Sequence, residues 1–173
     1  MTDARAVEDR LDVIETCTKM HWLVDRKQWD RLHEVLASEV CFPTLEEQES
    51  DGFDPASCVR SLESIMASYE ITLGGLFTQH LIAGHQVELD GDTAVCQAHS
   101  INVHYPLPPA EGSRVTHGNE YLFELARTPA GWRITGRRTR ILWSEGDEQA
   151  HDVGAKQRQW LASMAADGSG PTA

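Results

Sequence analysis

Three side chains in this sequence, one aspartate and two histidines, are placed where they could do acid–base chemistry. Asp25 ends the first predicted helix, where its negative charge opposes the helix dipole and a basic residue would be the stabilising choice. His80 and His104 lie in two apolar runs that read as neighbouring strands. A carboxylate that holds one imidazole nitrogen fixes the tautomer and leaves the second nitrogen as a general base. The three residues together predict a site for proton abstraction.

Each of the three residues also has a structural interpretation. Asp25 could end its helix in water or pair with the neighbouring Arg26 or Lys27. A single histidine on a strand is more often a satisfied structural residue than a catalyst. Two histidines on neighbouring strands close to one buried acid favour the catalytic interpretation.

The remaining histidines do not form a metal-binding pattern. On one strand His80 and His85 have opposite parity, as do His99 and His104, so neither pair faces a single ion unless a bulge intervenes. The sequence contains no HExxH, GxSxG, GxGxxG or GxxxxGK[ST] motif. We therefore expect no metal site, no nucleotide and no other cofactor.

Composition and charge limit the classes of binding partner that we expect for this protein. The 173 residues suffice for one domain, and 15 Lys+Arg against 27 Asp+Glu give a net charge of −12. Such a field repels nucleic acid and anionic lipid, and no apolar run approaches the roughly 20 residues that span a bilayer. No secretory signal is recognised, and the four cysteines are scattered without a CxxC pair. We expect a cytoplasmic protein with buried free thiols.

The elements that position the candidate residues read as helices first and strands afterwards. Apolar residues at three- and four-residue steps predict helices over residues 4–25 and 29–36. The pair Asp54-Pro55 predicts a third helix over residues 55–69. Between them we expect a short strand at 39–43 and an exposed acidic loop at 46–54.

Four long strands follow, predicted at residues 77–88, 93–105, 114–127 and 132–144. This order is typical of the α+β class. The predicted architecture is a cone in which N-terminal helices pack on a strongly curved, mixed but mostly antiparallel sheet that encloses a pocket. Residues 1–150 form this domain. Residues 151–173 form a tail whose helix, expected over 152–164, either covers the pocket mouth or packs on the sheet or a neighbouring subunit.

Several segments together resemble the SnoaL-like branch of the nuclear transport factor two-like superfamily, and within it the scytalone dehydratases most closely. They are residues 24–32, 78–84, 103–104, 131–134 and 141–147. The resemblance implies that Asp25 and His80 form a pair and that His104 completes the base apparatus. Hexachlorocyclohexane dehydrochlorinase is similar, with an Asp-His pair at the matching positions.

The resemblance implies a cofactor-independent dehydratase, cyclase or isomerase, with a lyase favoured. Its substrate would be a small, hydrophobic, oxygenated molecule such as a polyketide, aromatic or steroid-like intermediate. The dehydratase's two water-orienting tyrosines fall on Val24 and Thr44, so the group that polarises the substrate must differ. The candidates for contacting the substrate are Tyr69, Asn119, Tyr121, Trp22 and Arg140.

Other readings stay open. The same fold serves as a non-catalytic binding module and as the small subunit of ring-hydroxylating dioxygenases, and an epoxide hydrolase is a third, weaker alternative. We also expect a homo-oligomer, a trimer by resemblance or otherwise a dimer. The apolar side chains available on the outer strands are Leu122, Ile141 and Trp143.

Overall fold

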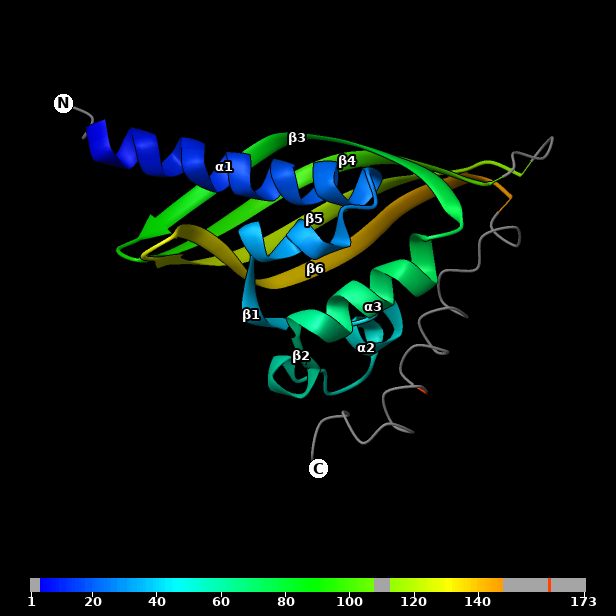
Figure 1. The fold of residues 1–173 in the computed structure, drawn as a ribbon, viewed down its shortest axis with the longest axis horizontal. Helices are drawn as coiled ribbons and strands as arrows, with labels where there is room; N and C mark the ends of the chain where they lie inside the picture. Colours follow the sequence, from blue (N-terminus) through cyan, green and yellow to red (C-terminus); the bar gives the residue numbers. More distant parts are fainter. Residues whose placement is uncertain (1–3, 108–112, 148–161, 163–173) are drawn as a thin grey trace.

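A bent sheet with helices against one face makes up the described part of the chain (Figure 1). The computed structural model describes residues 4–107, 113–147 and 162. The sheet has six strands in the order β2-β1-β6-β5-β4-β3, and it is open because β2 and β3 do not pair with each other. Its pairs are antiparallel except for β1 with β6, which is parallel. The mixed, mostly antiparallel α+β fold predicted from the sequence is confirmed.

The helical elements are α1 (Ala4–Asp25), the 3-10 helix η1 (Trp29–Glu34), α2 (Leu45–Glu49), the 3-10 helix η2 (Pro55–Cys58) and α3 (Leu62–Leu73). The strands are β1 (Leu36–Cys41), β2 (Val59–Ser61), β3 (Leu76–Asp90), β4 (Thr93–Pro106), β5 (Val115–Thr128) and β6 (Gly131–Gly146). The four long strands lie where the alternating pattern predicts them, each within three residues at either end. The helix expected over 152–164 lies outside the described residues.

The predicted third helix over residues 55–69 is wrong in its first half. Asp54 does cap a helical turn, since its carboxylate accepts a hydrogen bond from the Ala56 N–H at 3.0 Å. The chain then becomes extended at Val59, because Val59 pairs with Cys41 of β1. A second cap, Ser61, starts α3 by accepting from the Ser64 N–H at 3.3 Å.

Two shorter segments also differ from expectation. The acidic stretch expected as a loop contains α2, which begins with a capping box in which Thr44 and Glu47 bond reciprocally. The helix expected over residues 29–36 is a 3-10 helix that ends at Glu34. It stops there because Leu36 already pairs with Ile134 as the first residue of β1.

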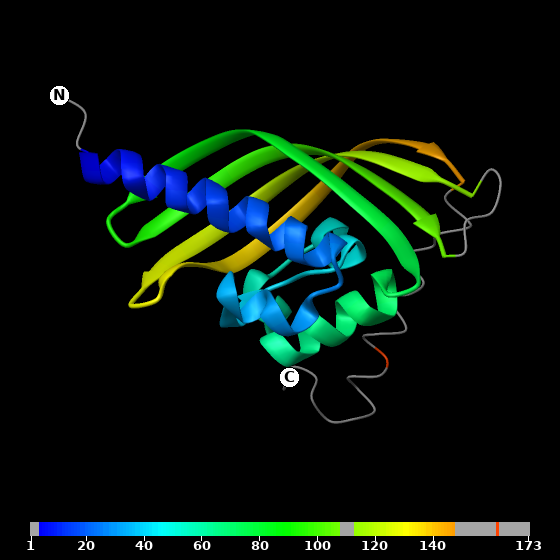
Figure 2. The same ribbon diagram turned by 45° about the horizontal axis from the view of Figure 1, so that its top comes forward.

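The long helix α1 supplies much of the core. Figure 2 shows β3 to β6 arching over α1, with α3 under one end of the sheet. Val13, Cys17, Met20 and Val24, at three- and four-residue steps on α1, are all buried. Nearer the start of the helix, Asp9 is tied to β5 by an ion pair with Arg127 at 2.7 Å. These contacts hold α1 along the sheet.

Three β-bulges change which side chains face the helices. On β3 the irregularity lies between Ala83 and Gln86, where Gly84 has a φ of +69° that favours glycine. On β6 one extra residue, Thr135, lies between the residues paired with Leu125 and Glu124. A second extra residue, Leu142, lies between those paired with Asn119 and Gly118. Each bulge reverses the alternation of inward and outward side chains.

The cysteines are all free, and Cys17, Cys58 and Cys96 are buried as expected, while Cys41 is half-buried. Among the described helices, none combines the length and apolar character needed to cross a membrane.

Candidate active site

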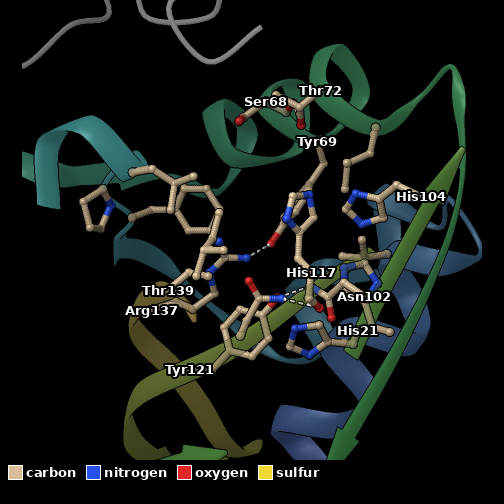
Figure 3. Close-up of a pocket in the computed structure, with 18 of the residues that line it drawn as sticks. His21, Ser68, Tyr69, Thr72, Asn102, His104, His117, Tyr121, Arg137 and Thr139 are labelled. Atoms are coloured by element: carbon tan, nitrogen blue, oxygen red, sulfur yellow. Dashed lines mark hydrogen bonds between the residues drawn. The ribbon is translucent and has the colours of Figure 1, made fainter. Parts of the chain in front are cut away.

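A cavity of about 290 Å³ lies between the helices and the concave face of the sheet (Figure 3). The sheet contributes side chains from β3 to β6, and α1 and α3 contribute the opposite walls. The apolar lining includes Val24, Phe42, Pro43, Leu45, Leu73 and Ile141. The polar lining includes His21, Ser68, Tyr69, Thr72, His80, Asn102, His104, His117, Asn119, Tyr121, Arg137 and Thr139.

Asp25 and His80 are in direct contact at this cavity. Asp25 Oδ1 lies 2.5 Å from His80 Nδ1, and Asp25 Oδ2 accepts the backbone N–H of His80 at 2.9 Å. The last residue of α1 therefore holds both the main chain and the ring of a β3 residue. A carboxylate beside Nδ1 keeps the proton on that nitrogen, which leaves Nε2 to accept a proton at the cavity.

Two further residues extend this contact behind the ring. Thr78 Oγ1 donates to Asp25 Oδ1 at 2.9 Å, and Lys27 Nζ donates to Thr78 Oγ1 at 3.0 Å. Burial by itself would raise the pKa of the Asp25 carboxyl, but the bonds from His80 and Thr78 outweigh burial and lower it. Burial lowers the pKa of the Lys27 ammonium to about 8. Asp25 is thus an ionised carboxylate that accepts hydrogen bonds from three donors.

His104 lies next to His80, as the two strands predict. It is only 6% exposed, and its ring centroid lies 5.4 Å from that of His80. His117 of β5 follows at 5.9 Å from His104, and its Nδ1 lies 3.0 Å from Ser144 Oγ. The structure therefore brings together Asp25, His80 and His104, and it adds His117 to the row.

His21 of α1 is a site residue that the sequence reasoning missed. Its ring lies 5.1 Å from that of His80 and 4.7 Å from that of Tyr121. Its Nδ1 lies 3.1 Å from the Cys17 carbonyl, and its buried Nε2 has no hydrogen-bond partner among the described residues. Burial, followed by the charge of His80, lowers the pKa of His21 to about 3. The available signal was its position four residues after Cys17 on the buried stripe.

The polar groups opposite His80 come from α3, β4, β5 and β6. Asn102 Nδ2 donates to Tyr121 Oη at 2.8 Å, and Asn119 lies within 3.5 Å of Ser100 Oγ. Arg137 Nη1 donates to Tyr69 Oη at 2.8 Å. Tyr69, Asn119 and Tyr121 were expected to contact the substrate, and all three line the cavity.

Trp22 and Arg140 were also expected to contact the substrate, but the structure does not bring them to the cavity. Trp22 is 59% exposed on the outer side of α1, where the Arg26 guanidinium lies 4.1 Å from its ring centroid. Arg140 is exposed and pairs with Glu120 on the outer side of the sheet. The bulge at Thr135 explains why Arg140 faces outward. The extra residue shifts the alternation of β6 by one position, so that Arg137 faces inward instead.

The two positions that resemble tyrosines of the dehydratase have separate roles. Val24 lines the cavity as part of its apolar wall, whereas Thr44 is buried and caps α2. Within residues 4–107, 113–147 and 162, no group of three or more His, Cys, Asp or Glu side chains is arranged to hold a metal ion.

Comparisons with known proteins agree with the fold. A family model described as a SnoaL-like domain matches residues 5–138, whereas a comparison with curated proteins gives no match. Among solved structures, the Kfla4162 protein of Kribbella flavida is 24% identical with a TM-score of 0.72, over 86% of this chain and 99% of that one. Hexachlorocyclohexane dehydrochlorinase LinA-type3 of Novosphingobium barchaimii is 13% identical with a TM-score of 0.64, over 87% and 97%.

A third similar structure is a candidate scytalone dehydratase of Novosphingobium aromaticivorans. It is 13% identical with a TM-score of 0.62, over 85% of this chain and 92% of that one. At these identities the structural neighbours establish the cone-shaped α+β fold, while the family model covers most of the described chain. The chain therefore belongs to the SnoaL-like family of the nuclear transport factor two-like superfamily.

Proposed function

We propose that the protein is an enzyme that removes a proton from a carbon atom of a small oxygenated molecule and so catalyses an elimination or an isomerisation without a cofactor. The observation that carries this proposal is the double attachment of His80 to Asp25, at 2.5 Å through the ring and 2.9 Å through the main chain. A structural histidine needs one partner. A general base needs a fixed ring and a fixed tautomer, and these two bonds supply both.

The proposed step uses groups at known places in the cavity. His80 Nε2 takes a proton from a carbon next to a carbonyl group, whose electron withdrawal makes that carbon acidic. Asp25 stabilises the imidazolium that forms. The donors Tyr121 and Asn119 lie in the same cavity and can bond to the oxygen on which negative charge develops. His104, whose ring centroid lies 5.4 Å from that of His80, gives a proton of its own to the leaving group or to a second carbon, and the proton held on His80 then replaces it.

The lining and the relatives support a compact, partly apolar substrate. The apolar side chains, among them Phe42, Leu73 and Ile141, offer a surface for its hydrocarbon part. Two similar structures carry the names of a dehydrochlorinase and a candidate dehydratase, and both named reactions are eliminations. We therefore favour a lyase over an isomerase, and a hydrophobic oxygenated intermediate as the substrate class.

The test uses model ketones in place of the natural substrate. A panel of cyclic, aromatic and β-hydroxy ketones is incubated with the protein in heavy water, and exchange at the α-carbon or loss of water is followed by proton NMR. His80→Ala should lower the rate by about 10²- to 10⁴-fold, the range of general-base catalysis. His99→Ala is the matched control, since His99 is exposed on β4 outside the cavity.

Equal rates in the wild type and His80→Ala would remove His80 from the mechanism. Panel members that bind in the cavity but never exchange would favour the alternative, a non-catalytic binding or dioxygenase small-subunit-like protein of the same fold.

A further inference from the structure

A cation lines the cavity, whereas the nearby carboxylate of Asp25 lies outside the lining and is bonded to His80 and Thr78. Among the described residues that line it, Arg137 alone is a Lys or Arg, and none is Asp or Glu. This differs from the chain as a whole, whose net charge is −12. A cavity with a cation and no lining carboxylate attracts an anion.

Arg137 differs from the arginines of this fold that are paired with carboxylates. Five other arginines form ion pairs with carboxylates, namely Arg31, Arg60, Arg127, Arg138 and Arg140. Arg137 forms no such pair within the described segments. Its Nε atom is buried and has no hydrogen-bond partner there either. A buried charged donor without a partner destabilises the folded state. The Nε–H of Arg137 is therefore available to a hydrogen-bond acceptor from outside the chain.

The guanidinium is nevertheless held in place. Arg137 Nη1 donates to Tyr69 Oη at 2.8 Å, and the guanidinium carbon lies 4.6 Å from the Phe42 ring centroid and 5.5 Å from that of Tyr121. These aromatic faces stabilise a cation without using its N–H groups. Figure 3 shows Arg137 and Tyr69 reaching each other from different walls, β6 and α3.

Tyr69 adds a second donor at the same point. Burial raises its pKa to about 12, so the phenol is neutral at physiological pH. Because Tyr69 Oη accepts from Arg137, its own hydrogen points elsewhere and can be donated to a ligand. The ring is fixed by stacking on Trp29, with centroids 5.7 Å apart. A guanidinium N–H from β6 and a phenol O–H from α3 therefore converge at one point of the cavity.

We infer that Arg137 and Tyr69 form a carboxylate-binding subsite, so that the ligand of this cavity is a small organic acid. The inference rests on the proposed function in taking the cavity as the place where the substrate binds. The planar guanidinium matches a carboxylate better than it matches a neutral carbonyl. The subsite anchors one end of the substrate while His80 acts on a carbon of the same molecule.

The test compares a small anion with its neutral counterpart at equilibrium. Benzoate and benzamide are titrated into the wild-type protein near neutral pH, and Kd is measured by calorimetry. Benzoate should bind about tenfold to a hundredfold more tightly, the difference expected for charge-assisted over neutral hydrogen bonds. Arg137→Gln should abolish this preference, because it weakens the binding of benzoate far more than that of benzamide, and Tyr69→Phe should reduce the preference in part.

Arg138→Gln is the matched control. It removes the same charge from the neighbouring residue, which pairs with Glu124 at 3.2 Å outside the cavity, so it should keep the preference for benzoate. Equal affinities of the wild type for the two probes would overturn the inference, as would no binding of benzoate at millimolar concentration. A preference that survives Arg137→Gln would overturn it too.

Two features keep the result interpretable. If Arg137→Gln fails to fold, the wild-type comparison and Tyr69→Phe, which keeps the stacked ring, still decide. The titration reads binding and not turnover, and it depends on Arg137 and Tyr69, whereas the exchange experiment depends on His80. A failure of the proton-abstraction proposal therefore shows in the exchange experiment alone, and a failure of the carboxylate subsite shows in the titration alone.

Discussion

The imidazole of His21 lies 5.1 Å from that of His80, centroid to centroid, although one ring comes from a helix and the other from a strand. Of these two rings, His80 has a carboxylate partner, whereas the Nδ1 of His21 lies 3.1 Å from a backbone carbonyl oxygen. Two neighbouring rings thus have different roles. His21 is a neutral part of the cavity wall, and His80 is the ring that we propose as the base.

This difference predicts how stability depends on pH. The pKa of His21 is 6.5 in an unfolded chain and about 3 in the folded one, so between these values the unfolded state binds more protons. The free energy of unfolding should therefore fall as the pH drops from 6.5 towards 3, by a few kcal/mol in all. Urea unfolding of His21→Gln across this range should show a weaker dependence on pH.

His33→Gln is the control for that experiment, since His33 is exposed and its removal should leave the pH dependence of the wild type in place. An identical pH dependence in His21→Gln and the wild type would show that another group dominates acid unfolding.

Asp25→Asn tests the tautomer of His80. The amide keeps the shape of the carboxylate but not its charge, so the proton is no longer held on Nδ1 at 2.5 Å. Turnover should fall by about 10²- to 10⁴-fold, and nitrogen NMR of the labelled protein should show that the Nδ1–H form no longer dominates. An unchanged tautomer together with full activity would contradict the role assigned to Asp25.

Thr78→Val against Thr78→Ser tests the support behind the carboxylate. Only the valine removes the hydroxyl that donates to Asp25 Oδ1 at 2.9 Å and accepts from Lys27 Nζ at 3.0 Å. We expect Thr78→Val to be less stable than Thr78→Ser by about 1–3 kcal/mol near neutral pH. Because the pKa of Asp25 is lowered in the folded state, its stabilisation is present above the unfolded pKa and is lost as the pH falls through the folded one. The difference in the free energy of unfolding between Thr78→Val and Thr78→Ser should therefore disappear below the folded-state pKa of Asp25.

An exposed apolar row on the outer face of the sheet favours self-association. Leu81 of β3 pairs with Ile101 of β4, and both side chains are exposed. Ile101 pairs in turn with Gly118 of β5, against which the exposed ring of Trp143 on β6 lies. We predict a homo-oligomer, a trimer favoured, that light scattering reports well above the 19.3 kDa of one chain. Leu81→Asp should shift it towards the monomer, and a wild type that is monomeric at micromolar concentration would contradict the prediction.

The long strands could be predicted from local alternation in the sequence, whereas the pairing of Asp25 with His80 was predicted from the resemblance to the scytalone dehydratases. Along β4 the alternation is uninterrupted as far as His104. On β3 the bulge between Ala83 and Gln86 shifts the register by one residue, so that Thr78 pairs with His104 and the ring of His80 comes to the same face. On β6 the same rule fails. Alternation continued from the buried Ile134 turns Arg138 and Arg140 inward, whereas the extra residue Thr135 turns Arg137 inward.

The place of His21 at the cavity could not be predicted from the sequence, for a different reason. A histidine on the buried stripe of a helix is ordinary core, and only the three-dimensional approach of Tyr121 and His80 shows that it borders a cavity. Such contacts join residues about 60 to 100 positions apart, and neither composition nor periodicity carries that information.

The bulges of β6 also affect how this chain is compared with its relatives. Thr135 and Leu142 each occupy a place that has no counterpart on β5. A relative that lacks one of them can keep the same inward-facing side chains with one residue fewer. An alignment that forbids gaps inside strands would then place Arg137 opposite an outward-facing residue of that relative. A cation shared by both cavities would look like a substitution, so homologues of this protein should be aligned on β6 by spatial superposition and not by residue count.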